Sequence, residues 1–218
     1  MNITSGFWVR SDAGGLILYK PLTPSLPCVT VFFGGRDCHE RRYIMDLIPS
    51  FSVDHRAIVP GIFVSREDMI GSSAVTTYDI RLKRPNREPV IDVAAMHSLE
   101  HIIATTLRND PDWKDEIIYW GPMGCLTGFY LILKNNRPAP ELYELILNAF
   151  KSVNDAQEVP GATPVNCGHY LMHNLEMAKL YASEFVAYLE ANAGKPEIFN
   201  YPKSDRLITN EGTLFYDS

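Results

Sequence analysis

Apolar and polar residues alternate along the middle of the chain in a pattern that predicts several strands. Period-two alternation and β-branched residues favour a strand over Val75–Lys83, which ends before Pro85. Four shorter apolar segments are also predicted as strands, because glycine, proline and polar residues bound them. They are Ser50–Asp54, Gly61–Val64, Glu116–Trp120 and Gly128–Leu133.

Helical periodicity is clearest where Asp92 can cap a helix that runs to about Leu107. Val93, Met96 and Ile103 give this helix an apolar stripe that ends at Leu107. Two further amphipathic helices are predicted at Pro138–Ala156 and Leu175–Leu189. Strands and helices interleave without a regular βαβ rhythm, so we predict an α+β fold in which an antiparallel sheet packs against helices.

The length and composition indicate one globular domain with additional segments at both ends. The chain has 218 residues, of which 46% are hydrophobic, enough to bury one sizeable core. Residues 1–44 show little periodicity beyond a strand-like segment at Cys28–Phe33, and we interpret them as an N-terminal extension. Residues 45–190 form the predicted domain, and the polar residues 191–218 are expected to be a C-terminal tail.

Charge and cysteine content favour a small-molecule ligand in a reducing compartment. The net charge of −6 is spread without long runs, so neither nucleic acid nor a membrane surface is expected as a partner. No apolar segment is long enough to span a membrane and the N-terminus lacks a signal-peptide pattern, which predicts a cytoplasmic protein. The four cysteines are interpreted as free thiols, because a chain of this size needs no disulfides.

Candidate chemistry is concentrated on the helix that begins after Asp92. His97 and His101 are four residues apart, which places both imidazoles on one helix face, where they can bind one metal ion. Cys167, in a loop before the last helix, can complete a His2Cys set that leaves one coordination position open. Glu100 flanks this set, and Cys125 lies in a glycine-rich bend where a thiol can transfer protons.

Five segments, in their order and spacing, resemble the S-ribosylhomocysteine lyase family, also called autoinducer-2 synthase or LuxS. They are Pro49–His55, Asp79–Asn86, His97–His101, Gly121–Tyr130 and Val159–Tyr170. The resemblance covers about Met45 to Leu189. Two places depart from the pattern: Leu126 stands where many members have a polar residue, and Tyr119–Gly121 stands where many have a segment that contains aspartate.

The resemblance implies a homodimeric enzyme with two active sites at the subunit interface and one divalent metal per subunit, iron(II) first, with zinc or cobalt as alternatives. It also implies that S-ribosylhomocysteine is cleaved to homocysteine and 4,5-dihydroxy-2,3-pentanedione, a product linked to quorum signalling and to the methyl cycle. The residues that it assigns are His97, His101 and Cys167 as metal ligands, Glu100 and Cys125 as acid/base groups, and Ser50, His55 and Arg81 as substrate contacts.

Two alternatives explain the same histidines differently. His-x-x-Glu-His is also the inverted zinc-peptidase signature, in which a distant glutamate such as Glu176 is the third ligand. A structural metal in a non-enzymatic domain would instead have four protein ligands, and His169 or His173 would complete that set.

Overall fold

The computed structural model describes residues 7–10, 16–19, 29–31 and 53–202, and the chain separates into two compact units, residues 1–47 and residues 48–218. In the first unit, three strands form an antiparallel sheet in the order β1-β2-β3. They are β1 (Phe7–Arg10), β2 (Leu16–Tyr19) and β3 (Val29–Val31). Only β3 lies in a segment that the sequence predicted as a strand.

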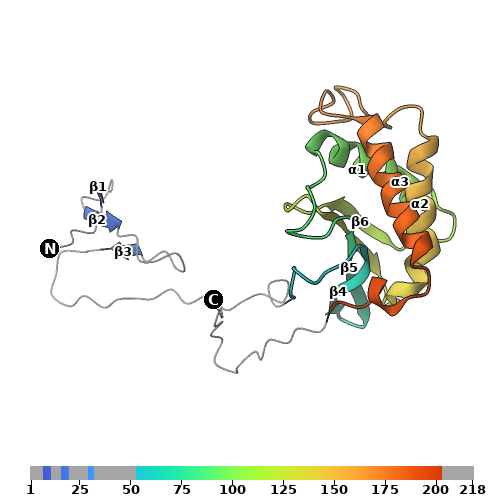
Figure 1. Cartoon of the computed structure of the whole chain (residues 1–218), viewed down its shortest axis with the longest axis horizontal. Coiled ribbons are helices and arrows are strands. Elements are labelled where there is room, and N and C mark those ends of the chain that lie inside the picture. Colours follow the sequence, from blue (N-terminus) through green and yellow to red (C-terminus); the bar gives the residue numbers. More distant parts are fainter. Residues whose placement is uncertain (1–6, 11–15, 20–28, 32–52, 203–218) are drawn as a thin grey trace. The chain divides into compact units, whose positions relative to one another are not determined.

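The second unit contains a four-stranded antiparallel sheet, in the order β4-β5-β7-β6, and three α-helices (Figure 1). The strands are β4 (Gly61–Ile70), β5 (Ser73–Arg81), β6 (Ile117–Pro122) and β7 (Gly128–Lys134). The helices are α1 (Val93–Asn109), α2 (Tyr143–Asp155) and α3 (Leu175–Ala191), with 3-10 turns at Ala139–Leu142 and Pro196–Ile198. The predicted α+β class with an antiparallel sheet is therefore confirmed for this unit.

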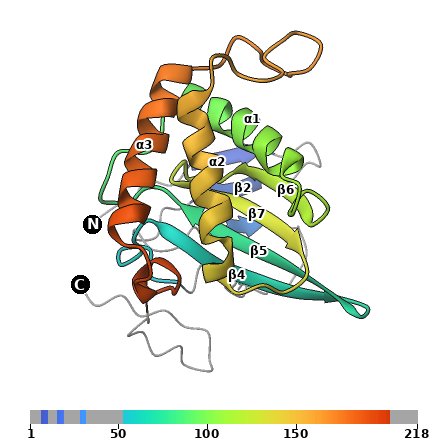
Figure 2. The same cartoon turned by 90° about the vertical axis from the view of Figure 1, so that its right-hand side faces the viewer.

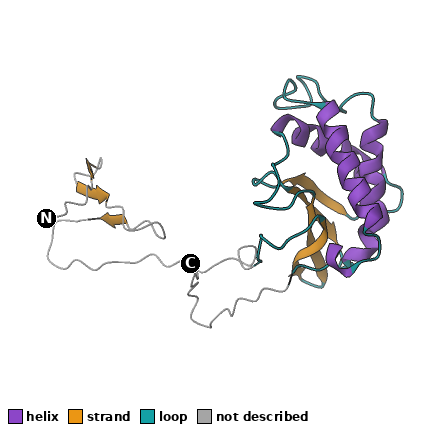
Figure 3. Cartoon of the chain, viewed as in Figure 1, coloured by secondary structure: helices purple, strands orange, loops and turns teal. Residues whose placement is uncertain are grey.

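The three helices pack together on one face of the sheet (Figures 2 and 3). Side chains alternate between the faces of a strand, so Tyr78 and Ile80 of β5 enter the core while Asp79 and Arg81 point to the opposite face. The ring of Trp120 on β6 enters the same core. The sheet thus separates an apolar layer from a face that carries polar, chemically active side chains.

Helix α1 joins the core to the predicted metal motif. Asp92 caps it by accepting a hydrogen bond from the backbone N–H of Ala95 at 3.0 Å. Leu99 and Ile103 are fully buried, and each contributes about 1.5–3 kcal/mol to folding. Val93, predicted in the apolar stripe, is instead 49% exposed because it lies at the helix start. None of the helices in the described ranges is long and apolar enough to cross a membrane.

The predicted strand Ser50–Asp54 is wrong where it can be compared with the structure. Residues 53 and 54 form no strand, and the rest of the segment lies outside the described residues. The Asp54 carboxylate accepts a hydrogen bond from the backbone N–H of Arg56, and its carbonyl accepts one from Ala57. Aspartate favours such turns because its short side chain bonds to the backbone two residues later.

The described part of the predicted C-terminal tail packs against the sheet. Ile198 is buried in the core, and the ring of Tyr201 stacks on Phe63 of β4 with 4.7 Å between ring centroids. The Tyr201 hydroxyl donates a hydrogen bond to Asp79 Oδ2 at 2.8 Å. The burial of Ile198, the stacking of Tyr201 on Phe63 and the bond to Asp79 therefore hold this segment against the rest of the unit. From its polar composition we had expected it to be a tail.

Candidate functional site

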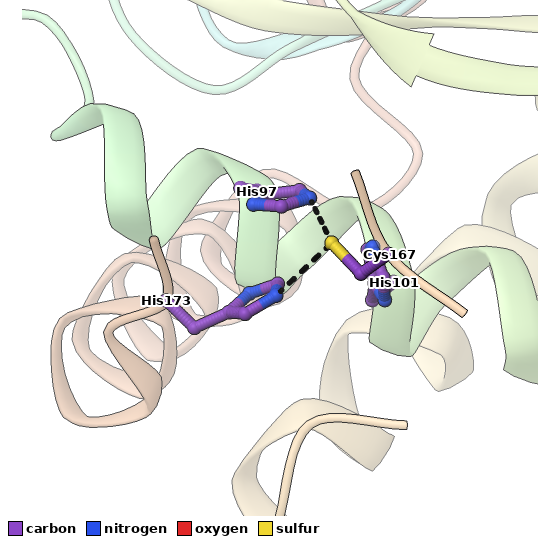
Figure 4. Close-up of side chains that lie close together, drawn as sticks. All are labelled: His97, His101, Cys167 and His173. Atoms are coloured by element: carbon purple, nitrogen blue, oxygen red, sulfur yellow. Dashed lines mark hydrogen bonds between the residues drawn. The ribbon is translucent and has the colours of Figure 1, made fainter. Parts of the chain in front are cut away.

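The sequence-predicted metal ligands converge at one point between α1 and the loop that precedes α3. His97 and His101 extend from adjacent turns of α1, and Cys167 approaches them from the loop (Figure 4). His173 lies in the same group, and the four ligand atoms all lie within 4.8 Å of one another. We call His97, His101, Cys167 and His173 the imidazole–thiol cluster.

Backbone carbonyls orient both α1 imidazoles. His97 Nδ1 donates to the carbonyl oxygen of Met172 at 2.8 Å, and His101 Nδ1 donates to that of Pro160 at 2.7 Å. A carbonyl oxygen can only accept, so each Nδ1 carries a proton, and in the neutral form of each ring Nε2 is the nitrogen with the free lone pair. Metal-binding histidines are commonly oriented this way, by a hydrogen bond from the other ring nitrogen.

The position of Cys167 also fits a metal ligand. Its Sγ lies 3.4 Å from His97 Nε2 and accepts a hydrogen bond from the backbone N–H of His169. With metal–nitrogen and metal–sulfur bonds of about 2.1 and 2.3 Å, a tetrahedral site separates nitrogen from sulfur by about 3.6 Å. The donor types, their free lone pairs and this spacing therefore fit a divalent metal ion.

His173 stays neutral at ordinary pH. Its ring stacks on His97 with 4.0 Å between centroids and meets His101 edge-on at 4.9 Å. Partial burial, and then the neighbouring His97 and His101, lower the pKa of His173 to about 4. Sequence reasoning had considered this residue only as the last ligand of a structural site.

A second group of polar residues surrounds the thiol of Cys125 on the opposite face of the sheet. Arg81 Nη1 lies 3.7 Å from Cys125 Sγ and donates a hydrogen bond to Thr127 Oγ1 at 2.6 Å. Because Thr127 Oγ1 accepts from Arg81, its own proton is available to Cys125 Sγ, 3.1 Å away. Arg81 Nε donates a hydrogen bond to Asp79 Oδ1 at 3.0 Å, and the side chains of both residues are almost fully buried. We call Asp79, Arg81, Cys125 and Thr127 the arginine–thiol group.

The arginine–thiol group favours the thiolate form of Cys125. Partial burial of Sγ raises the pKa of this thiol, but the hydrogen bonds with Thr127 and the charge of Arg81 outweigh that effect and lower the pKa below its ordinary value. The residue as a whole is exposed, so a ligand can reach it. An accessible thiol with a lowered pKa is suited to proton transfer.

A tight turn presents this thiol. Leu126 has a φ of +58°, a left-handed conformation that is uncommon for leucine. Its N–H bonds to Met123 and its carbonyl accepts from Ile91, both at 2.9 Å, so the turn is held on two sides. A side chain at Gly128 would place Cβ 2.4 Å from the carbonyl oxygen of Ile80, which explains the glycine that follows the turn.

Beside Arg81 the same face contains a small cavity of about 30 Å³. Its lining includes His55, Tyr130 and Tyr201 together with the Asp79–Arg81 pair. His55 is oriented by a 2.9 Å hydrogen bond between Nδ1 and the carbonyl of Val53. Two predicted substrate contacts, His55 and Arg81, therefore lie together, whereas the third, Ser50, lies outside the described residues.

The two glutamates considered from the sequence occupy different places. Glu100 is half-buried on α1, beside the ligand His101, and among the described residues its carboxylate makes no hydrogen bond or ion pair. Glu176 lies in the first turn of α3 and is not part of the imidazole–thiol cluster. The peptidase alternative needed Glu176 at the metal, so the structure disfavours it.

Comparison with known proteins gives matches that include both the imidazole–thiol cluster and the arginine–thiol group. The sequence model of the S-ribosylhomocysteinase (LuxS) family matches residues 48–195, about two thirds of the chain. The chain belongs to this family. Proteins named S-ribosylhomocysteine lyase from Phocaeicola vulgatus and Borreliella afzelii are 46% and 47% identical to it, over 162 and 159 residues. These alignments cover 74% and 72% of this chain and 100% of each relative.

One of the two departures from the family pattern, at Tyr119–Gly121, has a structural consequence. At Tyr119–Gly121, a Cβ on Gly121 would lie 1.9 Å from the Tyr119 hydroxyl, so the tyrosine side chain fills the space above the glycine. Tyr119 is 45% exposed there. Where the resemblance places an aspartate-containing segment in many family members, this chain thus presents the phenol of Tyr119 on β6, an edge strand of the sheet.

Proposed function

We propose that this chain cleaves S-ribosylhomocysteine to homocysteine and 4,5-dihydroxy-2,3-pentanedione by carbonyl migration and β-elimination. One observation carries the proposal: two imidazoles and a thiol converge at His97, His101 and Cys167 in a chain that aligns with the whole length of relatives named S-ribosylhomocysteine lyase. The product diketone is the molecule that the resemblance links to quorum signalling.

His97, His101 and Cys167 would hold one divalent metal per subunit, with iron(II) as the first choice and zinc or cobalt as alternatives. Imidazole nitrogen and thiolate sulfur suit all three of these ions. Once bound, such an ion supplies a Lewis acid that polarises a carbonyl oxygen and acidifies the neighbouring C–H group. The carbonyls of Met172 and Pro160 hold the rings in place for that role.

Glu100 and Cys125 would move the protons. Transfer of the carbonyl from C1 to C2 and then to C3 requires a proton to leave one carbon and another to return at its neighbour, twice in succession. Cys125 accepts a proton as thiolate and returns it as thiol, and its lowered pKa favours the thiolate that this exchange requires. Glu100 accepts and returns protons from α1, beside the metal ligands. When the ketone reaches C3, loss of a proton from C4 expels homocysteine from C5 as its thiolate, which is then protonated.

The substrate contacts would be Ser50, His55 and Arg81. Arg81 and His55 share the cavity beside Tyr130, where a guanidinium and an imidazole can bind hydroxyl groups of a sugar chain. Arg81 thus both binds substrate and stabilises the Cys125 thiolate.

The direct test combines lyase activity with metal content. Purified protein loaded with iron(II) should release homocysteine from S-ribosylhomocysteine, measured with a thiol reagent. Cys167→Ala should lose metal and activity together, whereas Glu176→Ala keeps both, because Glu176 lies outside the cluster. An empty site in the Glu176 variant, with metal retained in the Cys167 variant, would support the peptidase alternative instead.

We also propose a homodimer in which each active site takes residues from both chains. A two-fold interface brings the same surface of both subunits together. His55 lies with Arg81 on the sheet face opposite the helices, a surface that a partner can cover. Ser50 and His55 would then serve the site whose metal is held by the other chain.

Mixed dimers test this arrangement. Refolding Cys167→Ala chains with Ser50→Ala/His55→Ala chains gives mixed dimers with one doubly damaged site and one intact site. Random pairing makes about half of the dimers mixed, so about a quarter of wild-type activity should return although both parents are nearly inactive. Activity that stays near zero, with mixed dimers confirmed by mass spectrometry, would show that each chain builds its own site.

A further inference from the structure

One residue of the C-terminal segment reaches the arginine–thiol group. The Tyr201 hydroxyl donates a hydrogen bond to Asp79 Oδ2 at 2.8 Å, and Asp79 pairs in turn with Arg81. The match to the family model ends at residue 195, so Tyr201 lies beyond the part of the chain that this model describes. The contact therefore adds to the arginine–thiol group a residue that the resemblance does not assign.

The segment that carries Tyr201 has a fixed seat on the sheet. The turn Pro196–Ile198 packs against β4 (Figure 2). A side chain at Gly61 would collide with the carbonyl oxygen of Ile198, so the glycine permits this close approach. The ring of Tyr201 then stacks on Phe63, with 4.7 Å between centroids and 11° between the ring planes. These contacts set the position of the Tyr201 hydroxyl.

The phenol acts on Asp79 as a neutral donor. Burial, and then the negative charge of Asp79, raise the pKa of Tyr201 well above its ordinary value, so the hydroxyl keeps its proton. Asp79 Oδ2 accepts from Tyr201 and from Arg81 Nη2, while Oδ1 accepts from Arg81 Nε. Both carboxylate oxygens are thus bonded, which leaves Arg81 Nη1 directed at Thr127 and Cys125.

The Asp79–Arg81 pair shares its cavity with two further titratable side chains, His55 and Tyr130. Burial, and then the charge of Asp79, raise the pKa of Tyr130, so this phenol also keeps its proton. His55 bonds through Nδ1 to a backbone carbonyl. Among residues 53–202, neither side chain bonds to Asp79, so Tyr201 is the neutral donor that completes the hydrogen bonds of this carboxylate.

We propose that Tyr201 is a positioning residue for Cys125: it holds the Asp79 carboxylate so that Arg81 keeps Nη1 beside the thiol. The inference rests on the proposed role of Cys125 in proton transfer. Hydrogen bonds to a charged group are strong and directional, so loss of the phenol leaves Asp79 to be satisfied by Arg81 alone. The guanidinium then shifts toward the carboxylate and stabilises the thiolate less.

Tyr201→Phe tests the proposal, because it keeps the ring that stacks on Phe63 and removes one oxygen. The pH midpoint of Cys125 alkylation by iodoacetamide is taken from the difference between each protein and its Cys125→Ala counterpart. In the folded variant it should rise by about 0.3–1 unit, which lowers the thiolate fraction below the midpoint by about two- to tenfold. A midpoint at or below that of the wild type would overturn the proposal.

Tyr143→Phe is a matched control. The Tyr143 hydroxyl donates to the carbonyl of Leu189 at 3.2 Å, and its ring meets Phe199 edge-on with 6.2 Å between centroids. This variant also removes a bonded hydroxyl beside the C-terminal segment, but it leaves Asp79 untouched, so the alkylation midpoint should equal that of the wild type. A shift as large as that of Tyr201→Phe would mean that loosening of the segment moves the thiol, and the proposal would be wrong.

A second background tests the route through Arg81. In Asp79→Asn/Arg81→Met, the carboxylate and the guanidinium are both absent, so adding Tyr201→Phe should leave the midpoint unchanged. A further rise in this background would show that Tyr201 acts on Cys125 by another route and would refute the positioning role.

The alkylation measurements do not depend on lyase activity, so the two proposals can fail separately. If the wild type cleaves S-ribosylhomocysteine, the acid limb of its pH profile for kcat/KM should move upward in Tyr201→Phe by the same amount as the alkylation midpoint. A wild type that releases no homocysteine would refute the proposed function and leave the role of Tyr201 to the alkylation result. Normal cleavage together with an unmoved alkylation midpoint would refute the role of Tyr201 alone.

Discussion

The buried ion pair behind Cys125 gives a prediction that joins stability to chemistry. Arg81 is 3% exposed and Asp79 2% exposed, so Arg81→Met leaves a carboxylate in the interior, and among residues 53–202 its remaining hydrogen-bond partner is the Tyr201 hydroxyl. Removal of one member of a buried pair costs about 3–5 kcal/mol. At about 2–4 °C per kcal/mol for a unit of this size, the melting temperature should fall by about 6–20 °C.

The same substitution should make Cys125 less reactive at neutral pH. The positive charge of Arg81 favours the thiolate, which contributes to the lowered pKa of Cys125. Without that charge the thiolate is less stable, so the pH midpoint of alkylation by iodoacetamide should move upward. The difference in alkylation between each protein and its Cys125→Ala counterpart isolates this thiol from the other three cysteines.

Arg66→Met is a matched control, because Arg66 also pairs with an aspartate two residues away on a strand. That pair, Arg66 with Asp68, is 65% and 38% exposed and should contribute at most about 1 kcal/mol. Combined with Arg81→Met, Asp79→Asn should restore most of the lost stability, since no unpaired charge remains. An equal loss of stability in Arg81→Met and Arg66→Met would show that burial of the pair does not cause the loss. An unchanged alkylation midpoint in Arg81→Met would show that the Arg81 charge does not lower the pKa of Cys125.

Three substitutions and one truncation give predictions that can be checked independently. Glu100→Gln and Cys125→Ala should each keep bound metal but slow turnover by about a hundredfold or more, and normal turnover would remove that residue from the mechanism. A chain that begins at Met45 should fold and cleave substrate like the full chain, since the family match begins at residue 48; insoluble or inactive protein would contradict this. Tyr201→Phe should cost about 1.5–3 kcal/mol in urea unfolding by removing a hydrogen bond to a charged carboxylate, whereas an unchanged midpoint would show that the Tyr201–Asp79 bond adds nothing.

Sequence periodicity predicted the helices well because each has a strong local signal. Asp92 caps α1 as expected, and α3 begins at the predicted Leu175. Strand ends were less accurate. The strand predicted as Gly61–Val64 continues to Ile70, because the polar residues beyond Val64 pair with β5 even though they lie in solvent. Because this part of β4 is held by backbone pairing and is not buried, its sequence has no hydrophobic alternation that would predict a strand.

The sequence predicted site residues where suitable side chains are also spaced so that local geometry brings them together. His97 and His101 are four residues apart on one helix, so their convergence follows from helix geometry. His173 and Tyr201 reach their groups through folding of distant segments, and no local pattern marks them. The resemblance supplied Cys125 and Arg81 as separate assignments, whereas the contact between them depends on the register of β5 against β7.

The surroundings of the two thiols fit the different roles that we propose for them. Cys125 has a permanent cation, Arg81, which is itself held by Asp79, so its thiolate is stabilised whether or not a metal is bound. Cys167 has imidazoles and a backbone N–H as its described neighbours, so a bound metal would supply the positive charge beside its thiolate. A thiolate committed to a metal cannot exchange protons with a substrate, and a thiolate next to a fixed arginine can. Cys125 therefore lies beside a guanidinium on the sheet and Cys167 lies among imidazoles beside the helix layer, so the two cysteines are suited to different chemistry.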